Sequence, residues 1–346
     1  MHLLKRGLFA CLATLLALSL AACGGSRTPA EPETPSVPAE TPVTLRLGAL
    51  KGPTAMGLVY LGGTYTDAEG REAPLYDMTL AASPDELTPA LMKGELDAAC
   101  IPANLAAVLY NRTGGEIVTL GINTLGVLYL VENGNAVKSW QDLAGTTLAA
   151  AGKGATPEYA LRYLLTENGL DPDGDLTIDW KSEHSECVAA LASGAATIAL
   201  LPQPFVTVAQ SKIDTLRVAL DLTAEWDTLD NGSALLTGVV AARRDFVEAH
   251  PAAVATFLAD YAASVEQVNG DAAAAAVKIG ELGIVDAAVA EKALPYCNIV
   301  CITGAEMQEK LSGYLQVLFD ADPASVGADG EGGALPGDDF YYNFGL

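Results

Sequence analysis

Two short loops carry residue types that can hold a small polar ligand. One reads Lys51-Gly52-Pro53-Thr54, and the other reads Lys153-Gly154-Ala155-Thr156, 102 residues further along. Glycine lets a ligand approach the backbone closely, threonine can cap a helix or donate to a ligand, and lysine adds local positive charge. The unpaired N–H groups at a helix start favour a small polar or anionic group. The alternative is that both loops are ordinary strand-to-helix turns.

Motifs of catalysis are missing from the sequence. The chain has three histidines, His2, His184 and His250, and none has a catalytic motif around it. His184 lies in a polar turn. Neither a GxSxG nucleophile elbow nor an HExxH zinc motif occurs, so hydrolase and zinc-protease functions lack their central residues. We therefore expect that the protein is not an enzyme and needs no cofactor.

The cysteines have no metal-binding pattern. No CxxC motif or paired zinc spacing occurs, so we expect no metal site. Two of the cysteines, Cys297 and Cys301, lie four residues apart, and we favour free buried thiols over a disulfide between them. The cysteines outside the N-terminal segment are Cys100, Cys187, Cys297 and Cys301.

The two loops belong to a longer repeat. The pattern Ala90-Leu91-x-x-Gly94, an apolar run and Pro102 recurs as Ala190-Leu191-x-x-Gly194, an apolar run and Pro202. Two matches in the same order and at nearly the same offset indicate two lobes built on one plan. Asn104 and Gln203 follow the ends of equivalent strands. Both could offer amide donors to a ligand, or could be solvated loop amides.

Alternating apolar runs and helical patterns predict α/β units. Ser83-Pro84-Asp85-Glu86 is a capping box that opens a helix ending at Gly94, and we expect Thr54 to cap a helix through Tyr60. Further helices are expected from Thr156 to Gly169, up to Gly194, and onward from Pro251. The expected strands span residues 45–50, 97–101, 147–151, 176–180, 197–201 and 235–241.

These elements predict a two-lobed α/β fold with two mostly parallel sheets flanked by helices. We expect lobe I to comprise residues 44–127 and 229–346, and lobe II to comprise residues 128–228. The chain then crosses between lobes near residues 126–130 and 222–232. Ligands of open parallel sheets sit beyond the carboxyl ends of the strands, which is where both loops fall. A ligand cleft and a hinge are therefore expected between the lobes.

Composition excludes several classes of protein. The 346 residues carry 43 acidic and 19 basic side chains, a formal net charge of -24. Such a charge repels phosphate backbones, so nucleic acid is not expected as a partner. Half of the residues are apolar, which excludes global disorder. The length suits about two domains.

The N-terminal segment predicts the location of the protein. Lys5 and Arg6 precede an apolar run, residues 7–20, that is too short to span a bilayer comfortably and has the layout of a secretory signal. Leu20-Ala21-Ala22-Cys23 resembles the bacterial lipobox, which implies removal of residues 1–22 and lipidation of Cys23, as by palmitate. Ordinary signal cleavage beside an incidental cysteine is the alternative. Residues 23–43 hold five prolines and are expected to form an extended tether.

Together these features resemble a known family. The lipobox, the tether, the paired lobes and the stretches 51–57 and 152–158 are similar to bacterial ABC-transporter substrate-binding lipoproteins. More narrowly, they resemble the type 2 periplasmic-binding-protein branch that covers nitrate, sulfonate, taurine and thiamine-precursor binders. The resemblance implies a monomeric extracytoplasmic receptor, anchored to the outer face of the cell membrane through its lipid. It would close on a small solute and present it to an ABC permease and its ATPase.

The resemblance also implies a set of ligand-binding residues. Glu158, one turn into its helix, could cap that helix or receive a ligand amine. Thiamine-precursor binders usually carry an Asp-Trp pair after the first strand, where this chain has Leu50-Lys51, so we favour a sulfonate-like solute over a pyrimidine. A pyrimidine receptor, a biosynthetic enzyme of the same fold and a sensor-coupled receptor remain alternatives. The implied site residues are Gly52, Thr54, Ala55, Asn104, Thr124, Gly154, Ala155, Thr156 and Gln203.

Overall fold

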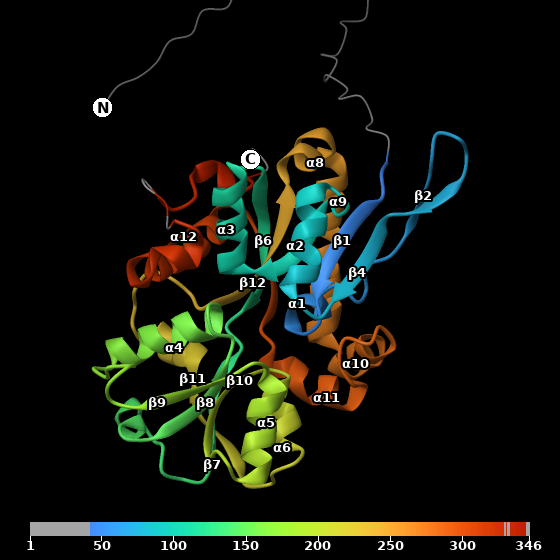
Figure 1. Ribbon diagram of the computed structural model, residues 1–346. Coiled ribbons are helices and arrows are strands. Elements are labelled where there is room, and N and C mark those ends of the chain that lie inside the picture. Colours follow the sequence, from blue (N-terminus) through green and yellow to red (C-terminus); the bar gives the residue numbers. More distant parts are fainter. Residues whose placement is uncertain (1–41, 329, 331–332, 344–346) are drawn as a thin grey trace, which may run out of the picture. The chain divides into compact units, whose positions relative to one another are not determined.

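The computed structural model describes residues 42–328, 330 and 333–343. The expected signal sequence, Cys23 and the tether up to residue 41 lie outside the described residues. Within the described part, no helix is both long enough and apolar enough to cross a bilayer. Two large sheets organise this part of the chain, and we call them and their covering helices lobe I and lobe II (Figure 1).

Lobe I is built on a six-stranded sheet. The strand β1 pairs in parallel with β4 on one side and with β5 on the other. The strand β12 runs antiparallel to both β5 and β6, and β13 runs antiparallel to β6. A small antiparallel hairpin of β2 (Thr64–Thr66) and β3 (Glu72–Pro74) projects beside this sheet (Figure 1). The strands in spatial order are β13 (Ile299–Ile302), β6 (Ile117–Leu125), β12 (Leu236–Arg243), β5 (Ala98–Pro102), β1 (Leu45–Leu50) and β4 (Tyr76–Ala81).

Lobe II is built on a five-stranded sheet. The strand β8 pairs in parallel with β9 and with β10. The strand β7, which enters from lobe I, runs antiparallel to β10 and β11. The strands in spatial order are β11 (Leu216–Asp221), β7 (Leu128–Asn133), β10 (Ile198–Pro202), β8 (Thr147–Ala151) and β9 (Thr177–Lys181).

Both sheets contain antiparallel strands but are mostly parallel in strand direction, as expected: β12 and β13 run against the other four strands of the lobe I sheet, and β7 runs against the other four strands of the lobe II sheet. The antiparallel strands β7 and β12 are the first strands after the chain passes from one lobe to the other. No crossover helix returns the chain to the starting edge at these points, and a parallel neighbour requires such a crossover. The chain passes between the sheets at residues 126–127 and again between α7 (Leu222–Asp227) and β12.

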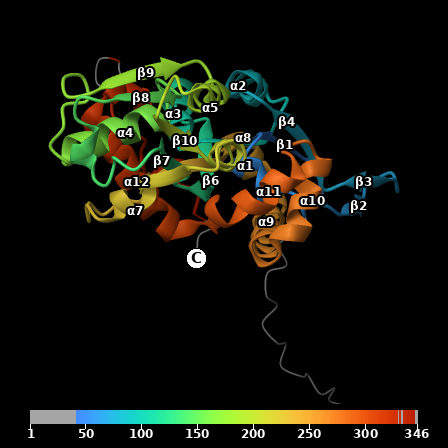
Figure 2. The same cartoon turned by 90° about the horizontal axis from the view of Figure 1, so that it is seen from below.

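Helices cover both faces of the lobe I sheet. One face packs against α2 (Pro84–Lys93) and α3 (Ala103–Thr113). The other face packs against a group whose longest member is α9 (Pro251–Gly270), and Figure 2 shows this group on the opposite side of the sheet from α2. The remaining helices of this lobe are α1 (Pro53–Met56), α8 (Arg244–Ala249), α10 (Ala272–Glu281), α11 (Ala287–Ala293) and the 3₁₀ turns η2 (Leu294–Tyr296), η3 (Pro323–Val326) and η4 (Asp338–Phe340).

The lobe II sheet is also covered on both faces. The helices α5 (His184–Ser193) and α6 (Phe205–Gln210) pack on one face, in a core that includes Val131, Leu191 and Leu201. The helix α4 (Thr156–Glu167) packs on the other face, beside α7. The 3₁₀ turn η1 (Trp140–Leu143) completes this lobe.

The C-terminal helix α12 (Gly304–Ala321) joins the two lobes. It contacts β6 and α3 of lobe I and α4 of lobe II. Its side chains Met307, Leu311 and Tyr314 are fully buried in a single apolar core that also contains Trp226 of α7. The ring of Tyr314 lies 5.8 Å from that of Trp226. The helix α12 therefore packs on both lobes.

Local sequence signals explain most helix boundaries. Ser83 and Glu86 form the expected capping box at the start of α2. Gly94 and Gly194 both end their helices in the left-handed conformation, each with φ of 74°. The expected cap at Thr54 is wrong: Thr54 lies inside α1, which ends at Met56, and its hydroxyl donates to the Leu50 carbonyl oxygen (2.9 Å).

Candidate functional site

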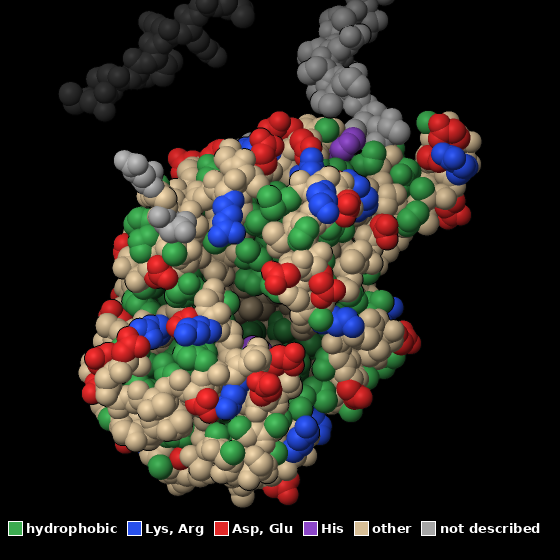
Figure 3. Space-filling model, in the orientation of Figure 1, with side chains coloured by type: hydrophobic (Ala, Val, Ile, Leu, Met, Phe, Trp, Pro, Cys, Tyr) green, Lys and Arg blue, Asp and Glu red, His purple; other side chains and the backbone are tan. Residues whose placement is uncertain are grey.

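A hollow of about 700 Å³ lies between the lobes, and Figure 3 shows hydrophobic side chains inside it. Loops that follow strand ends in both lobes line it. Lobe I contributes the turn after β1, the start of α2 and the connection between α10 and α11. Lobe II contributes the turn after β8 and the starts of α5 and α6. The lining residues are Lys51, Gly52, Ala82, Ser83, Pro84, Ala151, Gly152, Ser182, Glu183, His184, Ser185, Pro204, Phe205, Val208, Ile284 and Val285.

Of the nine residues expected at the site, Gly52 is the one that lines this hollow. It has φ of 125°, which side chains rarely allow. A Cβ atom at this position would meet no other atom within 4 Å. The backbone conformation, not crowding, therefore requires glycine here.

The other expected residues of lobe I are buried below the surface of the cleft. Thr54 and Ala55 are enclosed within α1. Asn104 donates through Nδ2 to the Ser325 carbonyl oxygen (3.2 Å). The hydroxyl of Thr124 is fully buried and, like Asn104 Oδ1, has no hydrogen-bond partner among the described residues. Both lie at the edge of the sheet where β5 and β6 end, since Gly238 of β12 pairs with Pro102 and with Thr124.

In lobe II, the expected side chains of Thr156 and Gln203 already form hydrogen bonds within the protein. Thr156 opens α4 but is not its cap, because Ala155 holds that position. The Tyr314 hydroxyl of α12 donates to the Thr156 hydroxyl (3.1 Å). Gln203 is buried, and its Oε1 accepts from the Thr207 hydroxyl (3.0 Å).

Glu158 acts as a helix cap, which decides between the two roles that the sequence left open. Its carboxylate accepts from the Gly154 N–H (2.7 Å). Glu86 accepts in the same way from Ser83 N (3.0 Å), and Glu186 accepts from Ser182 N (2.9 Å). Each of these glutamates is the third residue of a helix, where a carboxylate is stabilised by the helix dipole.

His184 is a cleft residue that sequence reasoning missed. It is the first residue of α5, and its ring lies 5.3 Å from the ring of Phe205. Burial lowers the pKa of this imidazole from 6.5 to about 4, so the ring is neutral at pH 7. Its Nδ1 is shielded from solvent and has no hydrogen-bond partner in the described part of the chain.

The repeat held a signal for this region. Glu183 stands one hundred residues after Ser83, and Glu186 stands one hundred residues after Glu86. Both helix starts line the hollow. The offset of one hundred residues that relates Gly94 to Gly194 therefore also relates the start of α2 to the start of α5. The sequence analysis applied this offset only to the ends of the two helices.

Positive charge at the cleft comes from Lys51. It is exposed and forms no ion pair with any described residue. The hollow also presents the hydroxyls of Ser83, Ser182 and Ser185. A lysine ammonium and hydroxyl groups are suited to binding a small polar or anionic group.

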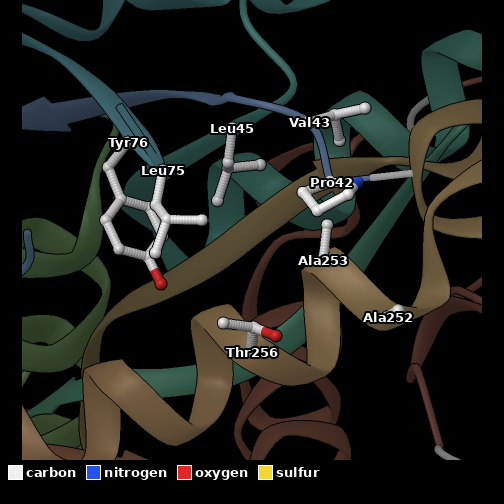
Figure 4. Close-up of a pocket in the computed structure, with 8 residues that line it drawn as sticks. All are labelled: Pro42, Val43, Leu45, Leu75, Tyr76, Ala252, Ala253 and Thr256. Carbon is white, nitrogen blue, oxygen red and sulfur yellow. The ribbon is translucent and has the colours of Figure 1, made fainter. Parts of the chain in front are cut away.

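A second hollow, of about 100 Å³, lies at the start of β1, and Figure 4 shows the side chains that line it. It lies between β1, β4 and α9 and is mostly apolar. Its tyrosine, Tyr76, donates its hydroxyl to Asp260 Oδ2 (2.5 Å). This hollow offers few polar groups to a ligand.

The described residues contain no group of three or more His, Cys, Asp or Glu side chains that could hold a metal ion. Cys297 and Cys301 are free thiols, as favoured from the sequence, although Cys301 is half-buried rather than buried. Burial raises the pKa of the Cys297 thiol to about 12 and that of Cys301 to about 11. Both thiols are therefore protonated at neutral pH.

Comparisons with known proteins give a family match and several solved structures of similar fold. A family model described as "ABC transporter, phosphonate, periplasmic substrate-binding protein" matches residues 72–289. An ABC transporter structure from Parabacteroides distasonis is 23% identical, with a TM-score of 0.72 over 87% of this chain and 99% of that chain. No curated protein matches the sequence.

Two sulfonate-binding structures are also similar. The periplasmic aliphatic sulphonate binding protein of Escherichia coli is 18% identical, with a TM-score of 0.64 over 82% of this chain and 89% of that chain. The alkanesulfonate-binding protein of Xanthomonas axonopodis pv. citri, bound to MOPS, is 17% identical, with a TM-score of 0.60 over 84% and 95%. The similarity confirms the two-lobed α/β fold that the sequence predicts.

Proposed function

The chain belongs to the family of periplasmic substrate-binding proteins of phosphonate ABC transporters, and we propose that it captures a small polar or anionic organic solute between its lobes by hinge closure. The family consists of substrate-binding proteins of ABC importers, which are not enzymes. The observation that carries the proposal is the hollow between the lobes, lined by loops that follow strand ends in both sheets. Closure of two such walls removes a ligand from water without covalent chemistry.

The solute class follows from the groups that face the hollow. Lys51 supplies a positive charge and Glu183 a negative one, and neutral His184 and three serines supply hydrogen-bonding groups. A sulfonate, a phosphonate or a similar oxyanion can accept hydrogen bonds from such groups. Gly154, Ala155 and Thr156 stay part of the proposed site at the start of α4. Asn104, Thr124 and Gln203, which are buried, also stay part of the proposed site.

The proposed organisation keeps the boundaries expected from the sequence. Residues 44–127 and 229–346 would move as lobe I, and residues 128–228 would move as lobe II, with the hinge at the two crossings. Lipidation at Cys23 would hold a monomer at the outer face of the cell membrane. There it would meet a permease and its ATPase.

A charge-reversal pair tests the site. In the full-length protein, Lys51→Glu is expected to weaken binding of an organic phosphonate or sulfonate about tenfold or more, because a charge-assisted hydrogen bond contributes about 1.5–3 kcal/mol. Lys93→Glu is the matched control, since it changes the net charge equally but lies at the other end of α2, outside the hollow. Isothermal titration measures both. Equal losses in the two variants would contradict this site.

A further inference from the structure

The apolar cores of the protein are arranged asymmetrically across the boundary between the lobes. One core is shared, since it contains Leu91 and Ile101 of lobe I together with Leu148 and Leu164 of lobe II. The core around α9 contains side chains of lobe I alone, and the core around α5 and α6 contains side chains of lobe II alone. The lobes can therefore part between the last two cores without dividing either, whereas parting them through the shared core would expose its apolar surface to water.

The helix α12 closes the shared core at this boundary. It contacts α4 of lobe II (Figure 1). Its Tyr314 is fully buried and donates its hydroxyl to the Thr156 hydroxyl at the start of α4 (3.1 Å). Tyr314 also packs against Trp226 of α7, with 5.8 Å between the ring centroids. Separating α12 from lobe II would therefore expose two of the largest buried side chains in the described part of the chain.

The same helix lies directly against one of the two crossings between the lobes. A Cβ atom at Gly313 would be only 2.9 Å from the Gly232 carbonyl oxygen and 2.9 Å from Ser233 Cβ, in the segment between α7 and β12. That segment is bonded to lobe II, since Trp226 Nε1 donates to Ser233 Oγ (3.0 Å). Glycine allows the close approach, and no long side chain of Gly313, Gly232 or Ser233 obstructs a turn between the two backbones.

The contacts on the side of α5 and α6 are looser. The helix α6 contacts α11 of lobe I, and Phe205, Val208 and Val285 are partly exposed where they line the hollow. Among the described residues, no hydrogen bond joins α5 or α6 to lobe I. This side is held by contacts between the surfaces of separate cores, so it costs less free energy to part than the side of α12.

We infer that α12 is the pivot of lobe closure: its contacts with α4, α7 and residues 232–233 persist while α5 and α6 move toward and away from lobe I. The inference rests on the proposed function, because it assigns an axis to the proposed hinge motion. A rotation displaces an atom in proportion to its distance from the axis, so a buried hydrogen bond at the axis survives a turn that opens the hollow. The C-terminal helix then controls access to the cleft, although none of its residues line the hollow.

Two pairs of spin labels test the inference in the full-length protein. Nitroxides are attached at azide-bearing residues, so that the native cysteines stay unchanged, and double electron–electron resonance measures the distance between them. The pivot pair joins Thr166 of α4 to Gln316 of α12, and the gate pair joins Asp85 of α2 to Ala189 of α5; all four residues are exposed. Each pair is measured without ligand and with an excess of methylphosphonate or ethanesulfonate. The gate pair should show distances for both parted and closed lobes, whereas the pivot pair should keep one narrow distribution throughout.

Gly313→Ala tests the contact between α12 and the crossing. Alanine is a better helix former than glycine, but its Cβ would push α12 away from Gly232 and Ser233. The gate pair should therefore shift toward the distance of parted lobes. Gly270→Ala is the matched control and should behave as the wild type, because Gly270 ends α9 and a Cβ atom there would meet no other atom within 4 Å. Melting curves establish that each variant is folded, and the label pairs in the wild type decide the question if Gly313→Ala is not.

The outcomes separate the inference from the proposed function. A gate pair that moves together with an equally mobile pivot pair would overturn the inference and leave hinge closure in place. The same would follow if the gate pair moved in the wild type but responded alike to Gly313→Ala and Gly270→Ala. One unchanged distance for each pair, in the wild type and in both variants, would show that the lobes do not move against each other. That result would overturn hinge closure, and the inference with it.

Discussion

His184 makes the stability of the protein depend on pH in a way that one substitution can isolate. Burial lowers the pKa of the folded imidazole to about 4, whereas an exposed imidazole in the unfolded chain has the ordinary value of 6.5. As the pH falls below 6.5, the unfolded chain takes up a proton that the folded chain does not. The stability present above pH 6.5 is therefore lost progressively as the pH falls toward 4.

The size of this loss follows from the two pKa values. Between pH 7 and pH 5 the unfolded His184 becomes almost fully protonated while the folded ring stays neutral. The free energy of unfolding should fall by about 2 kcal/mol over this range, and by about 3 kcal/mol by pH 4, because each pKa unit corresponds to about 1.4 kcal/mol. Acidic side chains titrate over the same range, so the difference between two variants is the useful quantity.

The assay compares urea unfolding of the wild type and His184→Gln between pH 7 and pH 5. The glutamine variant cannot take up this proton, so its stability should fall about 2 kcal/mol less than that of the wild type. His250→Gln, which removes a histidine outside the cleft, is the matched control. Parallel curves for the wild type and His184→Gln would refute the reasoning. A bound anion beside His184 should raise its folded pKa and shrink the difference.

Three further predictions concern stability, each measured by urea unfolding. Gly94→Ala and Gly194→Ala both place a side chain at φ of 74°, which costs about 1 kcal/mol. The two costs should be similar, because the Cβ of Gly94→Ala would lie 2.6 Å from Arg243 Nη1, the end of a flexible side chain that can move aside; a much larger cost for Gly94→Ala would show that Arg243 is held rigidly. Tyr314→Phe and Thr156→Val should each cost about 1 kcal/mol, and the double variant should cost less than their sum, because they share one hydrogen bond; strict additivity would show that the bond does not form. Asp97→Ala should cost about 3 kcal/mol, because this buried carboxylate accepts from Arg46 N and Nε (both 2.9 Å). Asp245→Ala, in an exposed pair with Arg243, should cost below about 1 kcal/mol, and a similar cost for both would contradict the role of burial.

Local sequence chemistry was sufficient for most of the fold. The capping box at Ser83 and the glycines at 94 and 194 fixed helix ends, since a cap depends on side chains within a few residues of it. The repeat correctly placed two equivalent helix-to-strand units, α2 with β5 and α5 with β10. The two-lobed α/β fold followed from these units. The antiparallel direction of β7 and β12 did not follow from these units, because it is set by the point at which the chain enters each lobe.

The candidate site shows where local signals end. The sequence by itself determined that polar loops follow the strands, and it predicted Gly52 as a residue of the cleft. The positive φ of Gly52 is a local backbone property, so a local pattern was enough to identify it. The tertiary structure alone decided which polar groups face the cleft. The Thr156 hydroxyl meets Tyr314, 158 residues away, and Ile284 joins a wall with Phe205 from the other lobe. The physical reason is that exposure and hydrogen-bond partners depend on what packs against a residue, and distant segments supply that packing.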